Sequence, residues 1–204
     1  MNKLDAVNYV LHLIGKPRAH ALSTGDANAA GIIEGLVDTE EDLVQSQGWY
    51  FNTAYDVDLT PVAGKVSVPT TRKIYHIDSM DDSANLVRRN SLLWDLDENA
   101  NDQFGTAKVT VKYVERLPWL EIPESFQRWI ATEAAIMANR NQAITYGATS
   151  DKAARQQDLH RDLGFARLEA MREESESQDL NVFETTEARN IRGRRNDAYV
   201  RSNF

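Results

Sequence analysis

The sequence predicts an α+β fold, in which an antiparallel β domain is inserted into a bundle of N-terminal and C-terminal helices. Apolar residues recur at helical spacing near both ends of the chain, whereas apolar and polar residues alternate in its middle. Helices that flank strands in this order are typical of an α+β layout. We expect N-terminal helices over 1–48, a β-rich domain over 49–118, C-terminal helices over 119–175 and an extended C-terminal arm over 176–204.

The composition limits the class of protein. The 204 residues carry a net charge of −8 and contain no cysteine, so neither disulfides nor thiolate metal sites are available. Asp5, Asn8 and His12 interrupt the first apolar stretch, and we therefore expect no signal peptide. No stretch approaches the ~18 consecutive apolar residues of a membrane helix. We expect a soluble intracellular product without a membrane partner.

Two helices are expected before residue 48. The first has the apolar residues Leu4, Val7, Val10, Leu11 and Ile14, and Gly15 with Pro17 supplies its stop. The second runs over about 28–47, and its apolar stripe is Ile32, Ile33, Leu36, Val37, Leu43 and Val44.

The stretch VQSQGWYFNT indicates a change of structure at Gly48. A helix commonly ends on a left-handed residue, a conformation that glycine adopts at little cost. We expect extended chain after it, with Trp49 and Phe51 on one face and Tyr50 on the other.

Several strands are expected in the middle of the chain. Alternation predicts strands over 55–61, 64–69 and 72–79, and a hairpin over 85–96 that turns near Arg89-Asn90. The clearest strand is 106–116, with Val109, Val111 and Tyr113 on one face.

Helices return after residue 119. Pro123 and Glu124 favour a helix start, and the apolar stripe that follows is Phe126, Trp129, Ile130, Ala134 and Met137. Ser150-Asp151 begins a last helix through about Glu174, whose mixed apolar side is Leu159, Leu163, Ala166, Leu168 and Met171.

No metal, cofactor or catalytic constellation is predicted. Asp95, Asp97, Asn99 and Asn101 alternate as in half of an EF-hand loop, but Ala100 and Thr106 stand where glycine and glutamate are required. We interpret this segment as a polar loop between strands. The four histidines, His12, His20, His76 and His160, are scattered and do not predict a zinc site.

Glu121 and Glu124 are the residues on which a virion-associated glycan hydrolase would be built. That chemistry needs two carboxyl groups at a defined separation across a cleft. Their closeness in sequence establishes no such separation, and roles at a helix start explain both residues better.

The end of the chain is basic. After Glu187 it carries Arg189, Arg192, Arg194, Arg195 and Arg201 against Asp197, a balance of +4 that leaves −12 on the rest of the chain. We interpret this arm as a partner-binding segment that is disordered in the free chain, with nucleic-acid contact or a solvated end as alternatives.

The order of three motifs carries a family resemblance. They are Ala6-Val7-Asn8 at a helix start, Ile14-Gly15-Lys16-Pro17 at a helix stop, and Gly48-Trp49-Tyr50-Phe51-Asn52 at a helix-to-strand junction. Together they resemble the tail tubular protein A family, the head-to-tail adaptors of short-tailed, podovirus-type bacteriophages. The resemblance spans residues 4–175 and is most specific in the first fifty, which makes Gly15, Pro17, Gly48, Trp49, Phe51 and Asn52 signature positions.

The resemblance implies a structural virion protein rather than an enzyme. Such adaptors form a ring of twelve copies that joins the portal protein to the tail nozzle protein and supports the tail fibres. DNA passes through the central channel without specific binding. The location implied is the virion tail, after assembly in the host cytoplasm. Two alternatives stay open at this point, a virion-associated glycan hydrolase and a non-viral cytoplasmic helical adaptor module.

Overall fold

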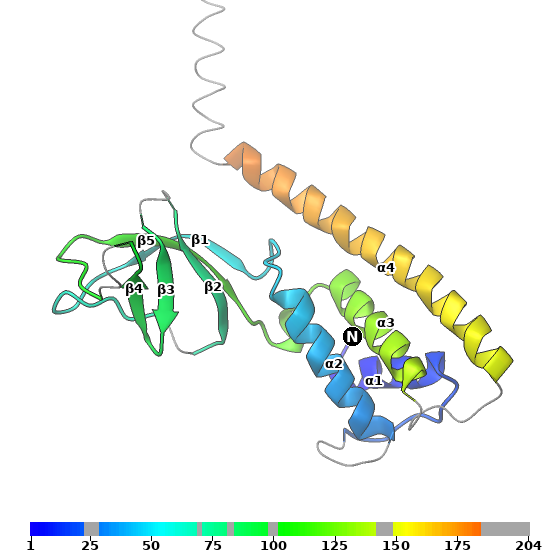
Figure 1. Ribbon diagram of the computed structural model, residues 1–204. Coiled ribbons are helices and arrows are strands. Elements are labelled where there is room, and N and C mark those ends of the chain that lie inside the picture. The colour runs from blue at the N-terminus through cyan, green and yellow to red at the C-terminus, as the bar shows by residue number, and fades with distance from the viewer. Residues whose placement is uncertain (23–28, 69–70, 81–83, 98–101, 142–148, 185–204) are drawn as a thin grey trace, which may run out of the picture.

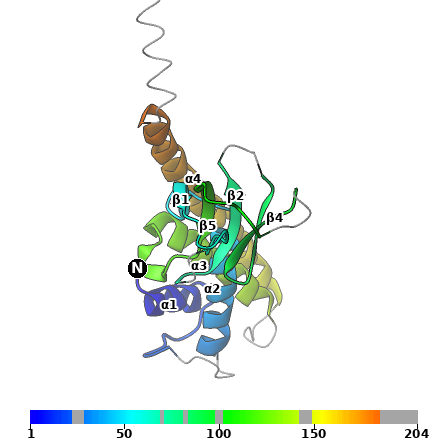
Figure 2. The same cartoon turned by 90° about the vertical axis from the view of Figure 1, so that its left-hand side faces the viewer.

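The computed structural model describes a helical part and a β part, which the chain connects twice (Figure 1). The described residues are 1–22, 29–68, 71–80, 84–97, 102–141 and 149–184, with side chains left out at 149–152 and 178–184. Figure 2 views the molecule from the β part, with the strands in front of the helices. The predicted α+β class, with antiparallel strands between helices, is confirmed.

Helix α1 (Lys3–Leu13) has the predicted start and stop. Asn2 caps its N-terminus, where the Asn2 side chain accepts a hydrogen bond from the Asp5 N–H at 2.8 Å. Gly15 follows the helix with φ +71°, and the Lys16 N–H donates to the Leu11 carbonyl at 2.8 Å. This is the glycine-terminated ending that the sequence predicts.

Helix α3 (Glu124–Arg140) lies at the centre of the helical part. It packs against α1, α2 (Ala29–Gln45) and α4 (Thr149–Glu184). Its surface is buried nearly all round because three helices cover it. The short 3-10 helix η1 (Trp119–Glu121) leads into α3, and Trp119 belongs to the same core.

The β part has a separate core. Strands β1 (Thr53–Leu59), β5 (Val109–Glu115) and β2 (Ile74–Ser79) form an antiparallel sheet in that order. Strands β3 (Leu86–Arg89) and β4 (Leu92–Asp95) form the predicted hairpin, which turns at Asn90 with φ +60°. The fully buried residues of this core are Val66, Leu93 and Val111.

Two strand and helix expectations were wrong in detail. Over 64–68, the described part of the expected strand 64–69, the chain forms the isolated bridges Val62–Lys65 and Ser67–Leu92 and no strand. Helix α4 continues to Glu184, ten residues beyond the predicted end, so the first part of the expected extended arm is helical.

Four residues assigned to apolar stripes are exposed in the structure. They are Leu43, Met137, Leu168 and Met171, with exposed fractions of 54%, 42%, 65% and 51%. Periodicity places a residue on a helix but does not reveal which side a neighbouring helix covers. Among the described residues, no helix is long and apolar enough to cross a membrane.

Candidate functional site at the junction of the helical and β parts

Gly48 meets two separate demands at the point where α2 gives way to the β part. Its φ of +78° lies in the left-handed region, and its N–H donates to the Gln45 carbonyl at 3.3 Å. A Cβ atom at this position would lie 2.9 Å from Cγ2 of Val114 in β5. Glycine is therefore required by the backbone conformation and by the close approach of the sheet.

The three aromatic residues after Gly48 do not lie on a strand, so the predicted division into two faces is wrong. Trp49, Tyr50 and Phe51 all surround Phe126 of α3, with ring-centroid distances of 5.0, 6.4 and 4.8 Å. They pack on the helical core rather than the β core. Such tilted and edge-on ring pairs add to the free energy gained by burial.

Asn52 explains why the strand starts later than expected. Its side-chain Oδ1 accepts a hydrogen bond from the Trp49 N–H at 2.8 Å, and its own N–H donates to the Trp49 carbonyl at 3.1 Å. These bonds close a turn over Trp49–Asn52, and β1 begins only at Thr53. A short polar side chain that competes for backbone hydrogen bonds thus overrides the aromatic preference for strand.

Asn52 also joins the two connections between the parts. Its Nδ2 donates to the Gln45 carbonyl at the end of α2 (2.7 Å) and to the Glu115 carbonyl at the end of β5 (3.1 Å). The Asn52 side chain is almost fully buried, with 2% of the residue exposed. The side-chain amide of Asn52 therefore binds the backbone at both points where the chain passes between the helical part and the β part.

Gln45 makes the matching contact from the helix. Its Oε1 accepts from the Leu117 N–H at 2.7 Å, and its Nε2 donates to the Leu117 carbonyl at 3.1 Å. Gln45 is fully buried, so these bonds form without competition from water. Sequence reasoning missed Gln45, although a glutamine in register with buried α2 residues is the kind of signal that predicts a buried polar contact.

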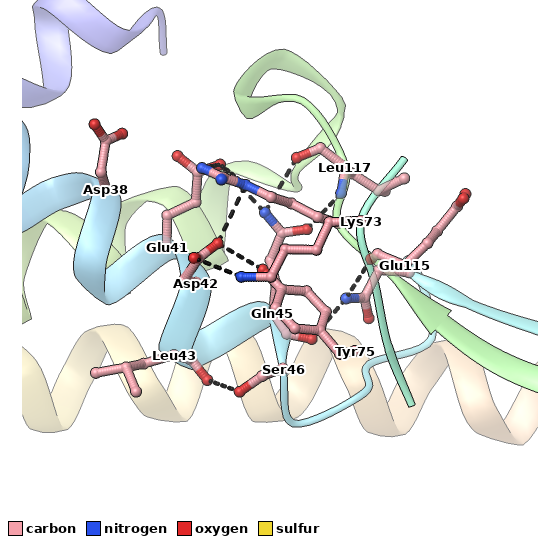
Figure 3. Close-up of polar contacts among 12 residues, drawn as sticks. Asp38, Glu41, Asp42, Leu43, Gln45, Ser46, Lys73, Tyr75, Glu115 and Leu117 are labelled. Atoms are coloured by element: carbon pink, nitrogen blue, oxygen red, sulfur yellow. Dashed lines mark hydrogen bonds and ion pairs between the residues drawn. The ribbon is translucent and has the colours of Figure 1, made fainter. Parts of the chain in front are cut away.

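Ion pairs surround the amides on the outer side of the junction (Figure 3). Glu41 of α2, which is 2% exposed, pairs with Arg116 at 3.1 Å and with Lys3 of α1 at 3.0 Å. Asp42 pairs with Lys73 at 2.8 Å and accepts a hydrogen bond from the Tyr75 hydroxyl at 2.7 Å. Carboxylates near the end of α2 thus bind Lys3 of α1, two cations that flank strands of the β part, and the phenol of Tyr75 in β2.

The environment of Asp42 favours its charged form. Partial burial opposes ionisation, but hydrogen bonds from Lys73 and Tyr75, together with the charge of Arg116, outweigh burial and lower the pKa of Asp42. Burial, and the hydrogen bond that Tyr75 donates to Asp42, raise the pKa of that phenol. The phenol therefore stays a neutral donor at physiological pH.

Helix α4 also binds the turn over Trp49–Asn52. Glu174 accepts a hydrogen bond from the Tyr50 N–H at 3.0 Å, and Glu173 accepts one from the Tyr50 hydroxyl at 2.7 Å. Glu173 also accepts a hydrogen bond from Ser125 at the start of α3. The orientation of the turn is consequently fixed by residues more than a hundred positions away in the sequence.

The sequence was compared with protein-family models and with curated proteins. The family model for tail tubular proteins matches residues 4–191. The chain belongs to the tail tubular protein family. No curated protein matches the sequence. Membership identifies a structural protein of the bacteriophage tail, a virion component that works within a tail assembly.

The other signature residues of this tail tubular protein, Gly15 and Pro17, lie away from the junction, just after the C-terminal end of α1. Asn8 binds the loop after Pro17, where its Oδ1 accepts from the Ala19 N–H at 2.7 Å and its Nδ2 donates to the Ala19 carbonyl at 3.1 Å. Arg155 of α4 donates to the Ile14 carbonyl at 2.9 Å, beside Gly15. The first motifs therefore fix the loop after Pro17 against α1.

The remaining sequence candidates are also placed. Glu121 pairs with Arg72 at 3.0 Å and Glu124 with Arg128 at 3.6 Å, and both carboxylates lie at the surface. The Asp97 N–H donates to the Asp95 carboxylate at 2.9 Å, and the Asp97 carboxylate accepts from the Asn85 N–H at 2.9 Å, whereas Asn99 and Asn101 lie outside the described residues. The part of the chain that the structure describes holds no cluster of three metal-ligating side chains. All five arginines of the arm lie outside the described residues: Arg189, Arg192, Arg194, Arg195 and Arg201.

Proposed function

We propose that this tail tubular protein is the head-to-tail adaptor of a short-tailed phage. In this role, a ring of twelve copies joins the portal protein to the tail nozzle protein, supports the tail fibres and surrounds part of the DNA ejection channel. It assembles in the host cytoplasm and transforms no substrate. The resemblance supplies the architecture of the ring, and the geometry of the junction supports it.

The observation that carries the proposal is the junction itself. Two separate hydrophobic cores meet at Gln45 and Asn52, whose side chains bind backbone groups at both crossings. Directional hydrogen bonds between buried groups fix an angle more tightly than apolar contact alone. A part that must present one surface to the portal and another to the nozzle needs such a fixed angle.

The charge of the chain suits a DNA conduit. Residues 1–187 carry a net charge of −12, so a channel wall built from them repels the phosphate backbone wherever its charges lie within about 8 Å of the duplex at physiological salt. Few phosphate-neutralising contacts mean that DNA slides instead of binding.

Electron microscopy of the protein mixed with its cognate portal tests the proposal. The expected result is a ring of added density on the narrow end of the portal, with twelve-fold symmetry. A chain that adds no density at any concentration would show that this family member has another place in the tail.

In the same proposal, the basic arm over 188–204 binds the portal protein. Arginine binds carboxylates in a planar, bidentate manner, and the arm contains five arginines and no lysine. Deletion of 188–204 is expected to abolish portal attachment at moderate salt. A control chain with the five arginines replaced by lysine separates guanidinium geometry from charge, and unchanged attachment after deletion contradicts the assignment.

A further inference from the structure

One short segment of the β part contacts the helical part along its length. The segment covers residues 72–76, here called the β2 latch, and includes the first residues of β2. At one end, Arg72 pairs with Glu121 of η1 at 3.0 Å. At the other end, Nε2 of His76 lies 3.1 Å from the Ser46 carbonyl, just after α2. These two contacts place the β2 latch against both η1 and the end of α2.

The middle of the β2 latch binds a single carboxylate, that of Asp42 in α2 (Figure 3). The Lys73 ammonium contacts this carboxylate at 2.8 Å, and the Tyr75 hydroxyl donates to it at 2.7 Å. The Lys73 ammonium also lies 4.7 Å from the centre of the Tyr75 ring, a cation–π contact that holds the two side chains together. The Arg116 guanidinium contacts Asp42 at 3.2 Å. One carboxylate of the helical part therefore binds groups from the β2 latch and from the segment after β5.

A β-bulge directs Tyr75 toward α2. The pairing of β2 with β5 shifts its register between Ile74 and His76, so Tyr75 is the extra residue of β2. In regular alternation Tyr75 would share a face with Ile77, which is buried in the β core. A bulge bends the strand and gives a side chain a new direction. The irregularity in β2 therefore lets the Tyr75 hydroxyl reach Asp42.

The β2 latch restricts a rotation that the rest of the junction leaves open. The chain passes between the two parts twice, and the amides of Gln45 and Asn52 hold these two crossings together. Two neighbouring crossings define a line, and rotation about that line stays free unless a third contact lies off it. Neither hydrophobic core contains described residues of both a helix and a strand, so core packing does not supply this contact. The β2 latch supplies it at Asp42, about one helical turn before Gln45.

We propose that the β2 latch sets the angle of the β part on the helical part and is released while both parts stay folded. The side chains of Lys73 and Asp42 are 52% and 36% exposed, so salt screens their attraction. The amides of Gln45 and Asn52 are buried and uncharged, so salt leaves them in place. Release therefore permits a hinge motion about the two crossings. In the proposed adaptor ring the latch holds each copy at the angle that its neighbours require, and this role rests on the proposed function.

Pulsed electron paramagnetic resonance between two spin labels measures this angle as a distance. The chain has no cysteine of its own, so Ser91→Cys/Gln157→Cys places one label on an exposed residue of each part. With an intact β2 latch, the labelled chain is expected to give one narrow distance distribution at low salt. Adding Asp42→Asn is expected to broaden the distribution about twofold, as a hinged part would. Salt at about 1 M, where the screening length is about 3 Å, is expected to broaden the distribution of the chain with an intact latch.

Asp58→Asn is the matched control. Asp58 also binds one lysine and one hydroxyl, those of Lys108 at 3.1 Å and Thr110 at 2.9 Å, but all three residues belong to the β part. The control removes the same charge and the same kinds of contact without touching a bridge between the parts, so its distribution is expected to stay narrow. Equal widths for Asp42→Asn and Asp58→Asn, whether narrow or broad, overturn the proposal.

Tyr75→Phe supplies a second measurement. It removes the hydroxyl that binds Asp42 and keeps the ring beside Lys73, so an intermediate width is expected. Circular dichroism checks that each variant is folded. If Asp42→Asn does not fold, Tyr75→Phe and the salt series decide the question, and an unchanged width in both contradicts the latch.

Electron microscopy of the same labelled chains with the portal separates the latch from the adaptor function. Distributions that broaden as expected, in a chain that adds no density to the portal, support the latch and reject the adaptor function. Rings formed by a chain whose distribution never broadens support the adaptor function and reject the latch.

Discussion

The side chain of Gln45 binds both backbone groups of Leu117, as a neighbouring strand would, across the boundary between α2 and the segment after β5. The Leu117 N–H and carbonyl are thereby satisfied in a site that water does not reach. Buried backbone groups almost always have a partner, and here that partner comes from another part of the fold. The Gln45 side chain consequently satisfies the backbone of Leu117, while Asn52 binds the carbonyls of Gln45 and Glu115.

Replacing Gln45 by leucine is expected to lower the free energy of unfolding by about 2–6 kcal/mol. Leucine fills a similar volume but leaves two buried backbone groups without partners, each of which costs about 1–3 kcal/mol. Urea unfolding followed by tryptophan fluorescence gives the value. Gln47→Leu is the control, since Gln47 is exposed two residues later, and a loss of equal size in both variants argues against the buried amide.

Gly48→Ala is expected to destabilise the protein by about 1–3 kcal/mol. Alanine is strained at positive φ, and its Cβ would meet Val114 Cγ2 at 2.9 Å. The double variant Gly48→Ala/Val114→Ala separates the two causes, because removing the methyl relieves the contact but not the strain. We expect a loss smaller than the sum of the single losses, and simple additivity would show that the close approach is unimportant.

Trp49→Ala is expected to cost about 3 kcal/mol of stability and to impair ring assembly on the portal. The substitution removes the ring packed against Phe126 and Trp129 and leaves the Val44 carbonyl without its indole donor. Trp49→Phe keeps an aromatic ring and loses only the hydrogen bond, so we expect an intermediate stability. Normal rings formed by a destabilised Trp49→Ala chain would show that the junction does not control assembly.

The contribution of the Asp42 charge to the free energy of unfolding is expected to disappear in acid. Its folded pKa is lowered, so its charge stabilises the fold above the ordinary carboxyl value of about 3.9 and is lost as the pH falls through the folded value. The difference in urea midpoint between the protein and Asp42→Asn should therefore be full at pH 6, begin to shrink as the pH falls below the ordinary carboxyl value of about 3.9, and vanish below the lowered folded value. A difference that stays constant with pH would remove the ion pair as its cause.

Glu40 is expected to show the opposite dependence of stability on pH in the same urea experiment. Burial, and the nearby charge of Glu133, raise its pKa above the ordinary value. Ionised Glu40 therefore opposes folding, and the penalty appears as the pH rises from the ordinary glutamate value through the raised folded value. Glu40→Gln is expected to raise the urea midpoint at pH 7 and to leave it unchanged below about pH 4, the range in which the native carboxyl is protonated in both states.

The sequence by itself determined the elements whose causes are local. Gly15 and Gly48 end helices because the chain there needs positive φ, and alternation over 109–115 predicts β5, in which Val109, Val111 and Tyr113 share one face and pack on the β core. The α+β order and the tail tubular family follow from the same local patterns.

Only the tertiary structure decided what those elements contact. Trp49, Tyr50 and Phe51 surround Phe126 because Asn52 closes a turn and α4 binds Tyr50. Phe126 and the carboxylates of α4 are too far away in sequence for a pattern to reveal these contacts. Gln45 was missed for the same reason, since its partner Leu117 is 72 residues away. Periodicity assigned Leu168 and Met171 to a buried side, but burial depends on which face a neighbouring helix covers, and α3 covers the other one.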